Sequence, residues 1–200
     1  MIKVAVDVMS GDHPAEVLLA GCFDALEELS DIEVIAVGEE GRIRAFAGAR
    51  AHDATRFTIL ASQTVIGMDE HPATACRQKR DSSVMMAAHA VRDGKADGFF
   101  SPGNTGATLA AATFVLGRIA GAHRPAILTA LPTRKGTGFL LDAGANADCK
   151  PEYILQFAIM GSAYAKYCAG VESPRVGLLN IGSEDTKGNE LALAVYPEMK

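Results

Sequence analysis

Short apolar runs alternate along the chain with longer stretches in which apolar residues recur every three or four positions. The first run, Ile2–Val8, is apolar almost throughout, which is typical of a strand buried on both faces of a parallel sheet. The stretch from Pro14 to Ser30 keeps helical spacing, and Pro14 stands where a helix can begin because its missing N–H is not needed in a first turn. The pattern therefore predicts strands and helices in alternation.

The same criteria predict the rest of the chain. Further strands are expected at Ile32–Val37, Phe57–Ala61, Ala96–Ser101, Ala126–Leu131, Gly138–Leu141 and Val176–Ile181. Helices are expected at Glu39–Ala49, Met68–Arg80, Ser82–Asp93, Asn104–Ile119, Pro151–Ala169 and from near Gly188 to the end. This alternation implies an α/β fold of three αβα layers around a mainly parallel sheet. We expect residues 1–200 to form one catalytic α/β domain, truncated at its C-terminal end because the chain stops inside a predicted helix.

Composition narrows the function classes. The formal net charge is −5 and Trp is absent, which argues against a general nucleic-acid-binding protein with a basic face and stacking aromatic side chains. The four cysteines, Cys22, Cys76, Cys149 and Cys168, match no zinc-ligand spacing. The N-terminus reads as a strand and no apolar stretch approaches the ~20 residues that span a bilayer, so we expect a cytoplasmic protein with reduced thiols.

Five polar loops stand out. In open α/β sheets ligands bind beyond the carboxyl ends of the strands, and these loops are expected at that edge. They are Asp7–His13, Lys79–Ser83, Ser101–Gly106, Asp142–Lys150 and Asn180–Glu190.

The loop Ser101–Gly106 is the clearest candidate for an anion site. Its glycines permit close approach of the backbone to a ligand, and Asn104 or Thr105 opens a helix whose first N–H groups lack partners and favour negative charge. The alternative is a plain helix cap. In Lys79–Ser83, Lys79 and Arg80 could neutralise an oxyanion while Ser82 and Ser83 donate hydrogen bonds; the alternative is a solvated basic turn.

The remaining loops carry amides, carboxylates and lysines. Asn146, Asp148 and Lys150 alternate before Pro151, and the alternative to a functional network there is a turn with a helix cap. Lys187, Gly188 and Asn189 could bind phosphate or a pantetheine arm, or simply connect two elements. His13 follows Asp12, a neighbourhood that can support proton transfer, although a loop histidine is more often merely exposed. Dinucleotide, Walker, esterase and zinc-protease motifs are absent from the sequence.

Taken together and in order, the loop strings resemble the phosphate acyltransferase family of bacterial phospholipid synthesis. The matching strings are Asp7–His13, Lys79–Ser83, Ser101–Ala107, Leu116–Arg118 with Arg124–Ala126, Asp142–Pro151, Arg175–Gly182 and Lys187–Glu190. The family usually has Ala and Gly where Val8 and Ser10 stand, and Ala where Pro102 stands, so no charged or amide group is lost. The resemblance implies that members extend beyond Lys200 by about a third of their length.

The resemblance implies transfer of a long-chain acyl group from acyl carrier protein to inorganic phosphate, in a homodimer that associates peripherally with the membrane. It implies a fold similar to phosphate acetyltransferases and isopropylmalate-type dehydrogenases. For this chemistry we predict phosphate binding by Lys79, Arg80, Ser82, Ser83, Asn104, Thr105 and Gly106. We predict catalytic roles for Asp7, His13, Asn146, Asp148, Lys150 and Asn180, and thioester or pantetheine binding by Lys187, Gly188 and Asn189. The scheme requires no metal and no cofactor.

Three alternatives stay open at this point. The first is a short-chain phosphate acyltransferase that uses coenzyme A. The second is a fragment that binds carrier protein without turnover. The third is a covalent route through Cys149, whose pKa Lys150 could lower, although a structural thiol is favoured. Docking of an acidic carrier protein would need a basic face, for which Lys79, Arg80, Arg118, Arg124 and Lys187 are candidates.

Overall fold

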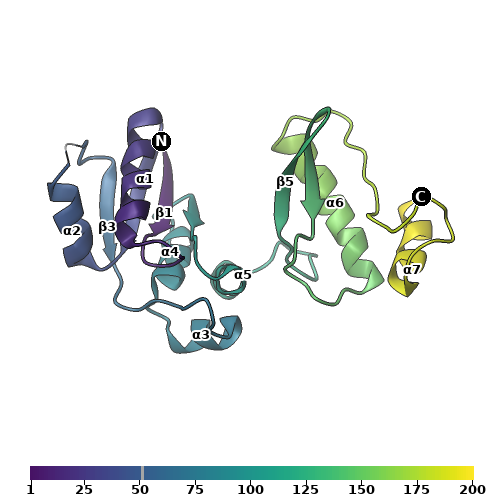
Figure 1. The fold of residues 1–200 in the computed structure, drawn as a ribbon, viewed down its shortest axis with the longest axis horizontal. Coiled ribbons are helices and arrows are strands. Elements are labelled where there is room, and N and C mark those ends of the chain that lie inside the picture. Colours follow the sequence, from purple (N-terminus) through teal and green to yellow (C-terminus); the bar gives the residue numbers. More distant parts are fainter. Residues whose placement is uncertain (51) are drawn as a thin grey trace. The chain divides into compact units, whose positions relative to one another are not determined.

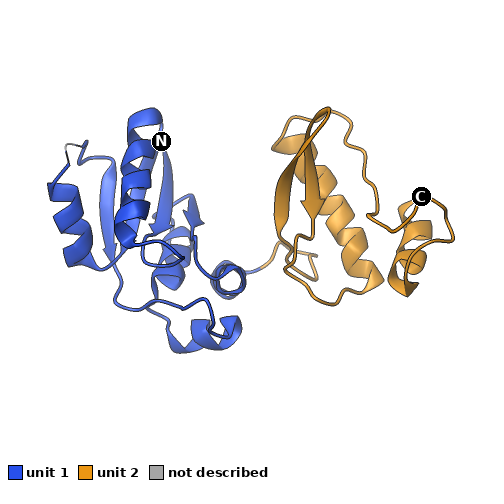
Figure 2. Ribbon diagram, viewed as in Figure 1, with its two compact units in different colours: residues 1–117 blue, residues 118–200 orange. Residues whose placement is uncertain are grey.

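The computed structural model describes residues 1–50 and 52–200, and contacts within the chain divide it into two units, residues 1–117 and residues 118–200 (Figure 2). Each unit is described by itself. The first unit contains β1 (Ile2–Asp7), α1 (Ala15–Glu28), β2 (Ile32–Gly38), α2 (Glu40–Gly48), β3 (Phe57–Ala61), α3 (Pro72–Gln78), α4 (Ser83–Arg92), β4 (Gly98–Phe100) and α5 (Thr105–Val115) (Figure 1).

The sheet of the first unit has four parallel strands in the order β3-β2-β1-β4. In its register, Val4 of β1 lies opposite Val34 of β2 on one side and Gly98 of β4 on the other. The central strand β1 thus has neighbours on both sides, which suits its almost uninterrupted apolar run. The α/β class predicted from the sequence is confirmed.

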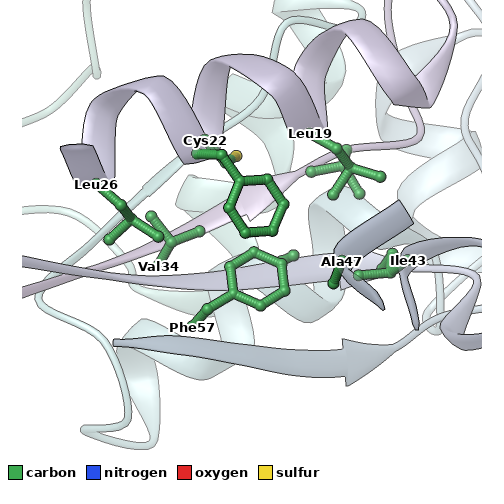
Figure 3. Close-up of a cluster of buried hydrophobic side chains, with 10 residues drawn as sticks. Leu19, Cys22, Leu26, Val34, Ile43, Ala47 and Phe57 are labelled. Carbon is green, nitrogen blue, oxygen red and sulfur yellow. The ribbon is translucent and has the colours of Figure 1, made fainter. Parts of the chain in front are cut away.

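Helices cover both faces of this sheet. On one face, α1 and α2 pack against β1, β2 and β3 through buried side chains, including Leu19, Phe23 and Val34. Figure 3 shows Leu19, Cys22 and Leu26 on α1 lying beside Val34 and Phe57 of the strands. On the other face, Ala87 and Ala90 of α4 pack against Ala5 and Val37, and these small residues allow a close approach of helix and sheet. Burying one large apolar side chain of this kind contributes about 1.5–3 kcal/mol.

An ion pair joins the two helices on the first face. The guanidinium of Arg42 in α2 donates from Nε to Oε1 of Glu16 in α1 and from Nη2 to Oε2, each over 2.6 Å. These bonds from Arg42 lower the pKa of Glu16 to about 2. Because the folded-state pKa is below the ordinary 4.5, the pair contributes stability above pH 4.5, and this contribution is lost as the pH falls toward 2.

We therefore expect Glu16→Gln to lower the melting temperature at pH 6 and to leave it nearly unchanged at pH 2. Since both partners are partly exposed, the effect should be small and should shrink in high salt. Melting followed by circular dichroism between pH 2 and 7 measures it. Glu40→Gln, which removes an exposed pair with Arg44 inside α2, is the matched control because it joins no two elements. A melting difference that grows toward pH 2 would contradict the assignment.

The second unit contains β5 (Leu128–Thr133), β6 (Gly136–Leu141), α6 (Pro151–Tyr167) and α7 (Glu190–Met199). Strands β5 and β6 form an antiparallel hairpin in which Thr133 lies opposite Gly136. Helix α6 packs against β6, where the rings of Phe139 and Tyr164 meet edge to face with centroids 5.3 Å apart. The two strands of this region are thus antiparallel, whereas the alternation pattern favoured parallel pairing.

Several predicted elements differ in extent, and one predicted strand does not form among the described residues. The predicted helix Met68–Arg80 begins only at Pro72, because a residue before proline disfavours helical backbone and because Glu70 accepts a hydrogen bond from the N–H of Gly67 outside the helix. The predicted strand Val176–Ile181 is wrong: the segment pairs with no strand among the described residues. Its Leu179 and Ile181 are 83% and 87% exposed, so apolar sequence alone did not make a strand where the backbone finds no pairing partner.

Among the described residues, the longest helices are too short or too polar to cross a membrane.

Candidate functional site

Buried polar side chains of the first unit gather at the carboxyl edge of its sheet. Asp7 ends β1 and Ser10 lies just beyond it, while Ser62 directly follows β3. Ser82 and Ser83 lie at the start of α4, which runs antiparallel to the strands because it leads into the amino end of β4. Buried polar groups are costly unless they are bonded, so their collection at one edge marks that edge as the candidate site.

Asp7 is completely buried and links two loops. Its Oδ1 accepts hydrogen bonds from the N–H groups of Met9 at 3.1 Å and Ser10 at 3.2 Å. Its Oδ2 accepts from the hydroxyl of Ser101 at 2.8 Å, and the Ser101 oxygen in turn accepts from the N–H of Gly103 at 3.3 Å. The carboxylate therefore holds the turn after β1 against the loop after β4.

The same two loops touch backbone to backbone through glycine. A Cβ at Gly103 would lie 2.5 Å from Cβ of Ser10, and a Cβ at Gly11 would lie 2.9 Å from the carbonyl oxygen of Pro102. Gly11 also has φ +97°, a conformation that side chains other than that of glycine rarely adopt. The loops can approach this closely only because both positions lack a side chain.

We expect Gly103→Ala to separate the loops, costing about 1–3 kcal/mol of stability as overpacked sites do. The new methyl group would meet the fixed β-carbon of Ser10 rather than the end of a flexible side chain. Urea unfolding followed by circular dichroism measures the cost. Gly21→Ala on α1 is the matched control, since its Cβ would meet nothing within 4 Å. Equal midpoints for the two variants would contradict the predicted contact.

Asn104 opens α5 with every hydrogen of its side-chain amide engaged. Its Oδ1 accepts from the N–H of Ala107 at 3.1 Å, which is the helix cap that the sequence allowed. Its Nδ2 donates to the carbonyl oxygens of Met68 at 2.9 Å, Glu70 at 3.3 Å and Gly67 at 3.4 Å. The side chain of Asn104 is therefore fully hydrogen-bonded within the protein. The side chain of Thr105 is exposed, and the N–H groups of Thr105 and Gly106, the first two of α5, have no acceptor within the helix.

In the Lys79–Ser83 loop, some side chains are hydrogen-bonded within the protein and others are not. Lys79 donates from Nζ to Oε1 of Glu70 at 2.6 Å and to the carbonyl oxygen of Val65 at 2.8 Å, and the Lys79 bond lowers the pKa of Glu70. Arg80 is exposed. The hydroxyls of Ser82 and Ser83 are buried and have no hydrogen-bond partner among the described residues. An unpartnered buried hydroxyl is rare in folded proteins and points to a missing partner.

His13 and its neighbour Asp12 are exposed in the turn between β1 and α1. The ring of His13 makes no hydrogen bond to the described residues. Its role in proton transfer therefore stays a prediction.

Among the predicted site residues of the second unit, some are likewise hydrogen-bonded within the protein and others are exposed. Asn146 donates from Nδ2 to the carbonyl oxygen of Pro125 at 3.0 Å and to Oδ2 of Asp142 at 3.1 Å. Asp148 and Lys150 are exposed on either side of Cys149. Burial, with a smaller effect of Asp142, raises the pKa of the Cys149 thiol, which is the opposite of the lowering that Lys150 could supply.

The loop before α7 is closed on itself. Asn180 donates from Nδ2 to the carbonyl oxygen of Lys187 at 2.8 Å, and Gly188 has φ +118° with its Cβ position only 2.8 Å from Oδ1 of Asn180. Asn189 caps α7 by accepting from the N–H of Ala192 at 2.9 Å. Lys187 is exposed on this loop.

Thiols are distributed unevenly between the units. Cys22 and Cys76 are buried in the first unit, and burial raises the pKa of Cys22 to about 11 and that of Cys76 above its ordinary value. In the second unit Cys149 is partly buried and Cys168 is exposed. All four are free.

Sequence reasoning missed Glu70 and Ser101 as members of the site. Ser101 begins a loop that was singled out, and its hydroxyl two positions before Gly103 was the available signal. Glu70 lay inside a predicted helix, and nothing in the sequence indicated that it would meet Lys79.

The α/β fold described above is similar to the fold of two phosphotransacetylases of known structure. A phosphotransacetylase from Streptococcus pyogenes superposes with a TM-score of 0.73 at 15% identity, over 100% of this chain and 65% of that one. The EutD phosphotransacetylase from Staphylococcus aureus gives 0.65 at 16% identity, over 99% of this chain and 64% of that one. At such identities the likeness shows the fold alone, and it confirms the predicted fold class.

Sequence comparison then gives the family. The family described as "Fatty acid synthesis protein" matches residues 2–200, and the chain belongs to it. A phosphate acyltransferase from Desulfitobacterium hafniense (strain Y51) is 49% identical over 197 residues, or 98% of this chain. One from Bacillus cereus (strain B4264) is 44% identical over 200 residues. The resemblance read from the loop strings is confirmed. The chain spans 58% and 59% of the length of these two relatives.

Proposed function

We propose that this chain carries the phosphate-handling part of an enzyme that transfers a long-chain acyl group from acyl carrier protein to inorganic phosphate. The observation that carries the proposal is the glycine-bearing loop Ser101–Gly106 at the head of α5, in a chain 49% identical to a phosphate acyltransferase. The product would be an acyl phosphate, suited to supply phospholipid synthesis.

The reaction needs no strong general base from the protein. A phosphate oxygen attacks the thioester carbonyl carbon, a C–O bond forms, the C–S bond breaks, and the pantetheine sulfur leaves as a thiolate that takes up a proton. Phosphate is already an anion near neutral pH. The protein must therefore hold the two reactants together and stabilise the oxyanion of the tetrahedral intermediate.

In the first unit, the proposed phosphate ligands are the hydrogen-bond donors that have no acceptor among the described residues. We assign the phosphate to the N–H groups of Thr105 and Gly106 at the start of α5, where unpaired N–H groups and the helix dipole favour an anion, and to the exposed hydroxyl of Thr105. Ser82 and Ser83 are buried hydroxyls without partners, and their place in the scheme is to complete the shell of donors when ligand is bound. Exposed Arg80 would supply positive charge.

In the second unit, the exposed Lys150 and Lys187 are the proposed cationic contacts of the thioester and its pantetheine arm. Asn146 and Asn180 use their side chains to shape the loops that carry these lysines. Asp148 is exposed in this unit, and it is a candidate to relay a proton to the leaving thiolate; exposed His13 of the first unit is a separate candidate for the same role. The raised pKa of Cys149 disfavours a thiolate nucleophile, so direct attack by phosphate is the preferred route.

The test is to incubate the protein with phosphate and, in parallel reactions, a long-chain acyl carrier protein thioester, the matching coenzyme A thioester, and a short-chain coenzyme A thioester. We expect acyl phosphate, trapped as the hydroxamate, and one free thiol per acyl group, with the carrier-protein thioester preferred. Preference for a short-chain coenzyme A thioester would replace the long-chain assignment. Carrier protein that binds without releasing thiol would reduce the chain to a binding fragment.

Homodimer formation and peripheral association with a membrane are further parts of the proposal. Light scattering after gel filtration measures the first, and flotation with anionic vesicles measures the second. Binding of acidic carrier protein through Arg80, Arg118, Arg124 and Lys187 should weaken as salt screens the charges.

A further inference from the structure

Segment Val65–Glu70, here called the clasp, is a loop closed by the side chain of Glu70. Oε1 of Glu70 accepts from the N–H of Gly67 at 2.6 Å and from Nζ of Lys79 at 2.6 Å. The same Nζ donates to the carbonyl oxygen of Val65 at 2.8 Å. One carboxylate and one ammonium therefore fix both ends of the clasp to each other and to the end of α3.

The clasp is also bonded to the head of α5. Nδ2 of Asn104 donates to the carbonyl oxygens of Gly67, Met68 and Glu70, while Oδ1 of the same amide caps the helix at the N–H of Ala107. Because the same amide donates to the clasp and accepts from α5, a shift of the clasp moves the first turn of α5 with it. If the clasp opens, Asn104 loses the acceptors that orient it, and the first turn of α5 loses its cap.

Resting on the proposed function, we propose that Glu70 is a positioning residue for phosphate and that Lys79 acts through Glu70 rather than by touching phosphate. The charge of Lys79 is already neutralised by Glu70, and two of its three hydrogens have acceptors within the protein. Glu70 and Lys79 together set the position of Asn104, and Asn104 sets the position of the N–H groups that face the anion.

A direct phosphate ligand would behave in the opposite way. If Lys79 bound phosphate, Glu70 would compete with the anion for it, and removing the carboxylate would strengthen phosphate binding. If Lys79 acts through Glu70, removal of either partner weakens phosphate binding to a similar degree, and removal of both adds little because the two belong to one network.

The experiment measures KM for phosphate and kcat for acyl phosphate formation in Glu70→Gln, Lys79→Met and the double variant. We expect each single change to raise the phosphate KM about tenfold, a typical coupling within one hydrogen-bond network, and the double variant to be no worse than the worse single. Lys79→Arg, which keeps the charge, should recover part of the loss. Glu40→Gln and Arg44→Met remove an exposed ion pair on α2 and serve as matched controls.

The proposal is overturned if Glu70→Gln leaves the phosphate KM unchanged or lowers it while Lys79→Met raises it, or if the two losses add. A second readout does not depend on turnover: amide hydrogen exchange in Glu70→Gln. Faster exchange at both Gly67 and Ala107 supports transmission from the clasp to α5, whereas faster exchange at Gly67 alone refutes it. If the unmodified protein forms no acyl phosphate, the proposed function fails, and the exchange result still decides the role of Glu70.

Discussion

Replacement of Asp7 by alanine is expected to lower the free energy of unfolding by about 2–4 kcal/mol, because it leaves buried donors without an acceptor. Three donors would be orphaned at once: the N–H groups of Met9 and Ser10 and the hydroxyl of Ser101. The turn after β1 and the loop after β4 would then move apart. Since displacement of a site by about 1 Å can cost a hundredfold in rate, we expect acyl phosphate formation to fall about a hundredfold.

The control for Asp7→Ala is Asp97→Ala at the opposite end of the sheet. Asp97 also accepts a backbone hydrogen bond, from Lys3 at 2.7 Å, but that bond is exposed to water. Urea unfolding followed by circular dichroism, combined with the acyl phosphate assay, measures both changes. Equal losses of stability in the two variants would show that burial of Asp7 does not matter, and full activity in Asp7→Ala would remove it from the site.

Replacement of Phe23 by alanine is expected to cost about 3–5 kcal/mol, since it removes a buried aromatic ring and leaves a cavity. The ring of Phe23 packs against Phe57 with centroids 4.8 Å apart and against Phe46 at 5.9 Å, so it joins α1, α2 and β3. It is 2% exposed. A loss of this size is a large part of the stability of an ordinary domain.

Val17→Ala is the matched control for Phe23→Ala, because Val17 lies on the same helix with 52% of its surface exposed. Unfolding must be followed by circular dichroism or hydrogen exchange. Trp is absent and the four tyrosines all lie beyond residue 117, so intrinsic fluorescence would report only on the second unit. A cost below about 1 kcal/mol for Phe23→Ala would contradict the core assignment.

The sequence predicted those elements whose structure depends on local pattern. Strand β3 was predicted with its observed limits, and β1, β2 and α4 to within a residue at each end, because buried strands and amphipathic helices have strong local signals. The strand at Val176–Ile181 was wrong because a strand also requires a neighbour, and a neighbour is not a local property. The antiparallel pairing of β5 and β6 was missed for the same reason.

Candidate site residues were predictable as residue types but not as contacts. Asn104 and Lys79 were predicted to bind phosphate because of the amide of one and the charge of the other. In the structure both side chains instead donate hydrogen bonds to carbonyl and carboxylate oxygens of residues 65–70. Glu70 was missed because its partner lies nine positions away across a turn and a helix. Such pairs arise from tertiary packing, which no spacing rule encodes.

The uneven distribution of the thiols makes the chain selectively labelable. Maleimides and related reagents react with exposed thiolates, and the two cysteines of the first unit are buried with raised pKa values. Cys168 is exposed near the end of α6, while burial raises the pKa of Cys149. A fluorophore or spin label can therefore be attached to Cys168 in the unmutated sequence, leaving the first unit and its sheet edge chemically untouched.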